Sequence, residues 1–288
     1  MTVSPAQTLR DLLAGPDIIV MPCCYDAFSA RLIERAGFPL TFMSGFSVSA
    51  ARLAMPDTGL ISFAEMVDQG RNICSAISIP MIGDGDTGYG NALNVKRTVG
   101  AYAQAGFSGI MIEDQVAPKR CGHTRGKQVV EFDEACQRLQ AAVDARNEGA
   151  DILIMARTDS RATHDMDEAM RRMTAFADIG ADILFLEAPQ TEDEMRRFCT
   201  EIPGPKMANM VEQGATPVLP PAGLQDIGYK IAAYPLTLLL AIVPVIERAL
   251  AALKEGRHPD GLATFTDLQE IVGFPEYFAA EKKYAVEE

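Results

Sequence analysis

The sequence lacks an excess of positive charge. Its 26 lysine and arginine residues face 39 aspartate and glutamate residues, which gives a formal net charge of −13 at pH 7. Proteins that bind the nucleic-acid backbone need clustered positive charge, so we expect no nucleic-acid partner. With 48 % hydrophobic and 23 % charged residues, the chain has the composition of a globular protein, which excludes disorder as its main state.

Long hydrophobic runs are also missing. The longest candidate, residues 231–246, contains Pro235 and Pro244, and its sixteen residues fall short of the roughly 20 that a membrane-spanning helix requires. We therefore predict a buried strand followed by a buried helix there, and no membrane partner. The N-terminus shows no basic region followed by an apolar core, so we expect no secretory signal. The six cysteines form no CxxC pair, which favours a protein of the reducing cytoplasm.

One local pattern recurs along the chain and predicts the fold class. A helix-like amphipathic stretch ends in Ala-Gly or Gly-Ala, a short apolar run follows, and a polar or acidic residue closes it, as in residues 105–114 and 179–187. Glycine is the expected residue after a helix, because it tolerates the left-handed conformation that ends the helix. Apolar runs without alternation suit strands that are buried on both faces of a parallel sheet.

Eight such runs alternate with helix-like stretches, which favours a parallel sheet with helices outside it. We predict strands at residues 18–22, 40–44, 81–84, 109–113, 152–156, 183–187, 206–209 and 231–234. This repeat number favours a single closed α/β domain, a (β/α)8 TIM barrel that spans residues 1–288. An open doubly wound sheet is the alternative that the pattern leaves.

Polar groups stand at nearly every predicted strand end. In such barrels the active site lies at the carboxyl ends of the strands. These ends carry Tyr25, Asp26, Ser44, Gly45, Asp84, Asp86, Glu113, Asp114, Arg157, Asp159, Glu187 and Asn209. So many carboxylates at one rim would repel one another without a cation to neutralise them. We therefore predict an active site with a bound cation at this rim.

The segment of residues 83–91 indicates which cation to expect. Asp84 and Asp86 stand two positions apart at a strand end, so both side chains can face the same mouth. Carboxylate and water oxygens favour Mg²⁺, with Mn²⁺ as the second choice. The chain has only three histidines, and none lies near these aspartates in the sequence, which argues against zinc. Taken alone, the segment is equally compatible with an ordinary turn rich in aspartate and glycine.

A second polar segment follows the predicted strand at residues 109–113. Cys121 lies there in a basic setting that favours a lowered thiol pKa, and Gly122 and Gly126 would let the segment move as a lid that excludes water. The basic neighbours are Lys119, Arg120, His123, Arg125 and Lys127. We expect the other five cysteines to be small buried hydrophobic residues.

These motifs resemble a known superfamily. Asp84-Gly-Asp-Thr-Gly-Tyr-Gly-Asn91, followed by Glu113-Asp-Gln115 and Lys119-Arg-Cys-Gly-His123, resembles the isocitrate lyase and phosphoenolpyruvate mutase superfamily over nearly the whole chain. The resemblance implies a barrel whose C-terminal helical region, about residues 236–288, is exchanged with a neighbouring subunit. It further implies a homotetramer built from two such dimers.

The resemblance also implies roles for individual residues. Mg²⁺ would bind at Asp84, with the other carboxylates nearby and partly bridged by water. Ser44, Gly45 and Phe46 would hold the 2-oxo acid end of the substrate, and Cys121 would be the general acid of a mobile segment. The full set comprises metal residues Asp84, Asp86 and Glu113, catalytic residues Cys121, Lys119, His123, Arg157 and Glu187, and substrate-binding residues Tyr25, Ser44, Gly45, Phe46, Asp57, Gly122 and Asn209.

Within the superfamily, the cysteine signature favours a carbon–carbon lyase over a phosphonate-forming mutase. The run from Cys121 to Val130 is similar to 2,3-dimethylmalate lyase and to petal death protein-like lyases, whereas methylisocitrate lyases have Arg-Pro-Asn-Lys at the place of residues 124–127. Oxaloacetate hydrolases carry a serine near the end of strand 8, where this chain has Tyr234-Pro-Leu-Thr237.

We therefore expect a Mg²⁺-dependent enzyme that cleaves a 2-alkylmalate, such as 2,3-dimethylmalate, to a 2-oxo acid and a carboxylic acid. The alternatives are oxaloacetate hydrolysis or decarboxylation, methylisocitrate cleavage, and a carboxyphosphoenolpyruvate or phosphoenolpyruvate mutase reaction. A non-catalytic binding protein is the remaining alternative, and it would leave both motifs without a purpose.

Overall fold

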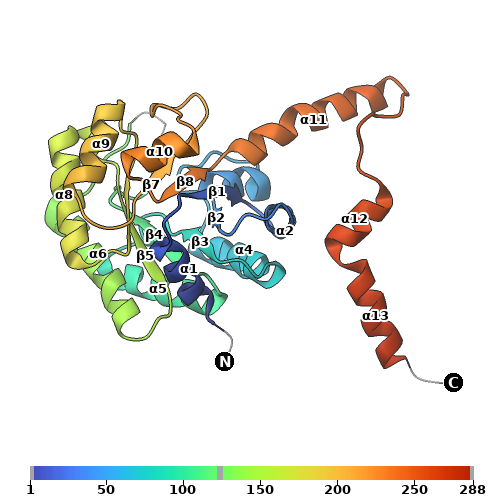
Figure 1. Ribbon diagram of the computed structural model, residues 1–288, viewed down its shortest axis with the longest axis horizontal. Helices are drawn as coiled ribbons and strands as arrows, with labels where there is room; N and C mark the ends of the chain where they lie inside the picture. The colour runs from blue at the N-terminus through green and yellow to red at the C-terminus, as the bar shows by residue number, and fades with distance from the viewer. Residues whose placement is uncertain (1–2, 122–125, 286–288) are drawn as a thin grey trace. The chain divides into compact units, whose positions relative to one another are not determined.

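The computed structural model describes residues 3–121 and 126–285 (Figure 1). The chain divides into two compact units, Met1–Leu238 and Leu239–Glu288, and the division falls inside helix α11 (Thr237–Lys254). Gly122 and His123, two of the predicted site residues, lie outside the described residues. Within the described ranges, no helix combines the length and apolar composition of a membrane span.

The first unit contains an eight-stranded parallel sheet in its described residues, with the strand order β6-β5-β4-β3-β2-β1-β8-β7. Pairing of β1 with β8 curls the sheet into a ring, and a single parallel bridge between Leu184 and Lys206 joins its two outer strands. The predicted α/β barrel is therefore confirmed as a nearly closed one. The strands are β1 (Ile19–Cys24), β2 (Thr41–Met43), β3 (Met81–Asp84), β4 (Gly109–Glu113), β5 (Leu153–Thr158), β6 (Ile183–Leu186), β7 (Met207–Asn209) and β8 (Ile231–Tyr234).

Helices connect the strands and end where the glycine pattern predicts. Gly106 and Gly180 follow their helices with φ angles of 101° and 105°, in the left-handed region that only glycine adopts easily. The helices of this unit are α1 (Pro5–Ala14), α2 (Ala27–Arg35), α3 (Gly45–Val48), the π-helix η1 (Ser49–Leu53), α4 (Phe63–Ala76), α5 (Ala92–Ala105), α6 (Phe132–Asn147), α7 (Ser160–Thr163), α8 (Met166–Ile179), α9 (Glu192–Glu201) and α10 (Pro221–Ile227).

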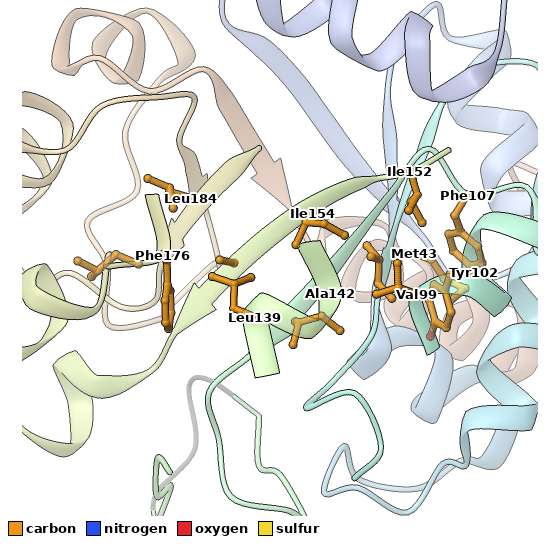
Figure 2. Close-up of a cluster of buried hydrophobic side chains, with 14 of the residues drawn as sticks. Met43, Val99, Tyr102, Phe107, Leu139, Ala142, Ile152, Ile154, Phe176 and Leu184 are labelled. Atoms are coloured by element: carbon orange, nitrogen blue, oxygen red, sulfur yellow. The ribbon is translucent and has the colours of Figure 1, made fainter. Parts of the chain in front are cut away.

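A buried apolar layer between the strands and the surrounding helices supports the strand that carries Asp84 (Figure 2). The rings of Tyr102 and Phe107 stack with their centroids 4.5 Å apart. A Cβ atom on Gly70 or Gly83 would lie 2.0 or 2.3 Å from the nearest Phe107 ring atom, so both positions need glycine. The Tyr102 hydroxyl donates a hydrogen bond of 2.8 Å to the backbone oxygen of Asp84. The core thereby fixes the end of β3.

The second unit consists of the rest of α11, α12 (Phe265–Val272) and α13 (Phe274–Tyr284). The prediction of a buried strand and a buried helix at residues 231–246 is correct for β8 and wrong for α11 in the single chain. Apolar side chains of α11 are exposed because the unit has no core of its own: α12 and α13 contain no buried residue. The exposed side chains include Leu240, Val243, Val245, Ile246, Leu250, Leu253, Phe265, Phe274, Tyr277 and Phe278. Exchange of this region between subunits stays a prediction.

Candidate active site

One cavity opens at the carboxyl ends of the strands, with an empty volume of about 590 Å³ that includes solvent at its mouth. Ten of the predicted site residues line it: Ser44, Phe46, Asp57, Asp84, Glu113, Lys119, Cys121, Arg157, Glu187 and Asn209. Three others, Tyr25, Gly45 and Asp86, do not. Six of these ten were predicted from their positions at strand ends: Ser44, Asp84, Glu113, Arg157, Glu187 and Asn209. The cavity also has lining residues that sequence reasoning missed, namely Cys23, Phe42, Met111, Arg120, Phe185, Met207, Val211, Ala233, Pro235 and Leu236.

Asp84 is held rigidly at the end of β3. Its Oδ2 accepts a hydrogen bond of 3.1 Å from the backbone N–H of Gly45, and its Oδ1 accepts one of 3.0 Å from the backbone N–H of Asp86. A Cβ atom at Gly45 would lie 2.5 Å from Asp84 Oδ2, so only glycine permits this approach. Gly45 therefore contributes to the site by positioning Asp84.

Lys119 crosses from the β4–α6 segment into a pair of buried aspartates. Its Nζ lies 2.6 Å from Asp57 Oδ1 and 2.9 Å from Asp86 Oδ1. Burial raises the pKa of Asp86 to about 6, and the Lys119 ammonium opposes this rise. Burial also disfavours the ammonium, but the surrounding carboxylates outweigh it and hold the pKa of Lys119 well above its usual value. Lys119 is thus an internal cation of the site.

Arg157, at the end of β5, lies among three carboxylates. Its Nε is 3.4 Å from Glu113 Oε2, and its Nη2 is 3.2 Å from Glu187 Oε2. The third carboxylate, Asp159, accepts two hydrogen bonds from the guanidinium. Burial raises the pKa of Glu113 well above its usual value, although Arg157 and Lys119 act against this. The Asn209 amide donates to Glu187 Oε2 at 3.3 Å and so completes the polar wall.

The donor set permits a magnesium ion that keeps part of its water shell. No three histidine, cysteine, aspartate or glutamate side chains in the described ranges form a group that could hold a metal by themselves. Mg²⁺ is usually held by one or two carboxylates, with water and substrate filling the other positions. Asp84 faces the cavity with both oxygens anchored, and the buried Glu113 Oε1 has no hydrogen-bond partner among the described residues. Asp86 is instead engaged by Lys119.

Cys121 is half-buried and lines the cavity. The Gln115 side chain fixes the preceding residue, because it accepts from the Arg120 N–H and donates to the Arg120 carbonyl, both at 2.9 Å. The basic surroundings predicted for this thiol are partly neutralised: Lys119 and Lys127 are both paired with buried carboxylates. The unpaired positive charge near Cys121 is therefore smaller than the sequence suggests.

Comparison with known sequences gives one consistent family. A family model described as phosphoenolpyruvate phosphomutase matches residues 9–254. The chain is 40 % identical to 2,3-dimethylmalate lyase of Eubacterium barkeri over 287 residues, covering 98 % of this chain and 99 % of the relative. It is 39 % identical to the chloroplastic carboxyvinyl-carboxyphosphonate phosphorylmutase of Arabidopsis thaliana (95 % and 83 % covered) and 38 % identical to the petal death protein of Dianthus caryophyllus (96 % and 88 % covered).

Solved structures extend the likeness to the whole fold. An oxaloacetate acetylhydrolase in complex with the inhibitor 3,3-difluorooxalacetate superposes with a TM-score of 0.93 at 32 % identity, covering 97 % of each chain. A 2,3-dimethylmalate lyase gives a TM-score of 0.93 at 35 % identity, covering 98 % of this chain and 96 % of the other. A phosphonopyruvate hydrolase bound to oxalate and Mg²⁺ gives 0.86 at 29 % identity, covering 98 % and 99 %. Similar folds therefore accompany different reactions.

Proposed function

The chain belongs to the phosphoenolpyruvate mutase and isocitrate lyase superfamily of enzymes, and we propose that within it the protein is a Mg²⁺-dependent carbon–carbon lyase. Its substrate would be a 2-alkylmalate such as 2,3-dimethylmalate, which it would cleave to a 2-oxo acid and a carboxylic acid. The observation that carries the proposal is the division of one cavity into an ionic side, an apolar wall and a half-buried thiol.

The apolar wall favours a dicarboxylate with alkyl groups over a tricarboxylate. Val211, Pro235 and Leu236 line the cavity from the ends of β7 and β8. These three side chains carry no charge, so a substrate carboxylate placed against them would be buried without a cation, which is costly. Alkyl substituents, by contrast, match the wall.

The loop after β8 argues against hydrolysis of oxaloacetate. The Ser47 hydroxyl donates a 3.1 Å hydrogen bond to the Pro235 carbonyl, which holds the wall in place. This chain has no serine in the loop of residues 234–237, and the hydroxyl of Thr237 is engaged because it donates to Glu212. Oxaloacetate hydrolysis nevertheless stays the second candidate, because the hydrolase structure has a TM-score as high as that of the dimethylmalate lyase.

Each group of the site then has a chemical task. Asp84 and Glu113 would hold Mg²⁺, with Asp57 and Asp86 acting through water, and the ion would supply Lewis acidity at the substrate's hydroxyl and carboxylate oxygens. Arg157 would bind a substrate carboxylate, with Glu187 and Asn209 beside it, and the segment Ser44–Phe46 would hold the 2-oxo acid end.

Proton and electron transfers balance over the whole cleavage. A carboxylate of the site takes the C2 hydroxyl proton, and the C2–C3 bond breaks with its electron pair moving to C3 of the departing acid. The Cys121 thiol gives its proton to C3 and becomes a thiolate. C3 thereby gains a C–H bond, and the departing acid is released as a carboxylate. A thiol that lines the cavity and is half-buried has the access that this general acid needs.

We also propose that subunits exchange their C-terminal helices within a homotetramer. Large exposed apolar surfaces mark interfaces, and α11, α12 and α13 carry many exposed apolar side chains on the second unit.

A substrate panel tests the function. Purified protein with Mg²⁺ is incubated with 2,3-dimethylmalate, 2-methylmalate, methylisocitrate, oxaloacetate and phosphonopyruvate, and products are identified by mass spectrometry. We expect cleavage of the alkylmalates, loss of turnover in excess EDTA and recovery with added Mg²⁺. Turnover restricted to oxaloacetate would establish the second candidate, and full activity in EDTA would refute the metal assignment.

A further inference from the structure

Asp159, which follows β5, is a buried carboxylate shared by two cations. Its Oδ2 accepts from Arg157 Nε at 2.8 Å, and its Oδ1 accepts from Arg157 Nη2 at 3.0 Å, a two-point contact that fixes the plane of the guanidinium. The same Oδ1 accepts from Lys127 Nζ at 2.9 Å. The Asp159 side chain is fully buried, and that of Lys127 is 5 % exposed. Arg157 therefore has its direction set by a residue that does not line the cavity.

A second layer of hydrogen bonds holds Asp159 itself. Its backbone N–H donates to Asp114 Oδ1 at 3.0 Å. The other Asp114 oxygen accepts from the Thr158 hydroxyl at 2.5 Å and from Arg172 Nη1, on α8, at 3.0 Å. Asp114, Thr158 and Arg172 are all buried, so buried hydrogen bonds within the barrel determine the position of Asp159.

Lys127 belongs to the chain that returns from the Cys121 segment. The backbone of residues 114–116 pairs with that of residues 128–130: Val116 N–H donates to the Gln128 carbonyl at 2.9 Å, and Val130 N–H donates to the Asp114 carbonyl at 2.8 Å. The segment that carries Cys121 is thus tied to the barrel on both sides. Lys119 is buried against Asp57 and Asp86, and Lys127 is buried against Asp159.

We infer that Asp159 is a positioning residue that aims Arg157 at the substrate carboxylate and, through Lys127, keeps Arg157 in register with Cys121. The inference rests on the proposed function, in which Arg157 holds one part of the substrate and Cys121 protonates another. A displacement of about 1 Å between such groups costs on the order of 10²-fold in rate, because the reacting atoms leave their near-attack arrangement. Asp159 contacts both Arg157 and Lys127, so its carboxylate can prevent such a displacement.

The experiment compares Asp159→Asn, Lys127→Met, Lys127→Arg and the double variant Asp159→Asn/Lys127→Met. The control is Asp182→Asn, since Asp182 also holds an arginine (Arg146, 2.6 Å) but stands at the start of β6, outside the cavity lining. For each variant, kcat and KM are measured with 2,3-dimethylmalate, affinity is measured with oxalate in the presence of Mg²⁺, and folding is checked by circular dichroism and Tm.

We expect Asp159→Asn to lower kcat/KM about 10²-fold and to weaken oxalate binding, because Arg157 loses its fixed direction. Lys127→Met should lower kcat about tenfold while oxalate affinity stays within about threefold, since Arg157 keeps its own contact with Asp159. Lys127→Arg should restore most of kcat. The double variant should match Asp159→Asn, because Lys127 acts through that carboxylate.

Three results would overturn the inference. In the first, Lys127→Met keeps a wild-type kcat. In the second, the losses of the two single variants multiply in the double variant. In the third, Asp182→Asn lowers kcat/KM as much as Asp159→Asn, which would make the effect one of general stability. If Asp159→Asn does not fold, the inference is tested by the loss of kcat in Lys127→Met and its recovery in Lys127→Arg. If the wild-type protein cleaves no malate, the proposed function fails, and the oxalate affinities still test the aiming of Arg157.

Discussion

Replacing Lys119 by methionine tests how much the buried ion pairs beside the cavity contribute to the free energy of unfolding. The variant keeps a side chain of similar length and removes the ammonium that lies 2.6 Å from Asp57 Oδ1 and 2.9 Å from Asp86 Oδ1. All three side chains are only 5 % exposed, so the two carboxylates would lose their partner while having little access to water.

The burial of these ion pairs determines how much stability the variant should lose. Breaking a buried ion pair costs about 3–5 kcal/mol, because it leaves an uncompensated buried charge. At about 2.1 cal/mol/K of unfolding entropy per residue, a chain of 288 residues should lose about 5–8 °C in Tm. Lys96→Met is a matched control: Lys96 Nζ also lies 2.6 Å from a carboxylate, Glu148, but these side chains are 40 % and 60 % exposed. Exposed pairs contribute about 0.2–1 kcal/mol, so the control should change little.

The loss of stability in Lys119→Met should also depend on pH. Burial raises the pKa of Asp86 to about 6, above its unfolded value, so ionisation of Asp86 costs folding free energy as pH rises through that range. Without Lys119, which lowers this pKa, the pKa rises further. The deficit of Lys119→Met should therefore grow between pH 5 and pH 8.

Urea unfolding in excess EDTA measures the free energy of unfolding without a divalent cation, and the double variant Asp86→Asn/Lys119→Met should recover part of the loss. A deficit equal to that of Lys96→Met, or one that shrinks with rising pH, would refute the reasoning.

Three further predictions address the acid, the core and the assembly. Cys121→Ser should lower 2-alkylmalate cleavage by about 10²–10⁴-fold and leave oxalate affinity unchanged, because serine is a far weaker acid; near-native cleavage would exclude Cys121 as the acid. Gly83→Ala should cost about 1–3 kcal/mol in urea unfolding, since the new Cβ would lie 2.3 Å from the Phe107 ring, whereas Gly100→Ala, with nothing within 4 Å, should not destabilise the protein. Sedimentation at micromolar concentration should give a tetramer, and a monomer would contradict subunit exchange.

The barrel was predictable because its signals are local. Glycine after a helix and an unbroken apolar run both act within a few residues, and the observed strands start and end within two residues of the predicted ones. The gathering of Asp84, Glu113 and Arg157 at one cavity followed from the same pattern, since the ends of parallel strands meet at one face of the barrel.

The partner of each charge could not be predicted in the same way. A basic run around Cys121 indicates positive charge, but two of its lysines reach buried aspartates on other elements, at Asp57 and Asp159. Such pairing depends on side-chain direction across the barrel, which no spacing in the sequence records. The exposed face of α11 was missed for a related reason: an apolar helix in a single chain looks the same in sequence whether its cover is its own core or another subunit.

The geometry separates an ionic side of the cavity from an apolar wall. Asp84 is fixed by the backbone of Gly45 and by Tyr102 behind β3, and Arg157 is fixed by Asp159, so a change in the ionic side must disturb hydrogen bonds that reach into the core. Val211 and Leu236 touch the cavity from loops after β7 and β8 and contribute only apolar surface. Changes there alter the volume offered to an alkyl group at about 25 cal/mol per Å² of apolar contact and leave the charges in place. Relatives with nearly the same fold carry the names of different reactions, and under the proposed function we expect the alkyl group of the substrate to be selected by the wall rather than by the carboxylates.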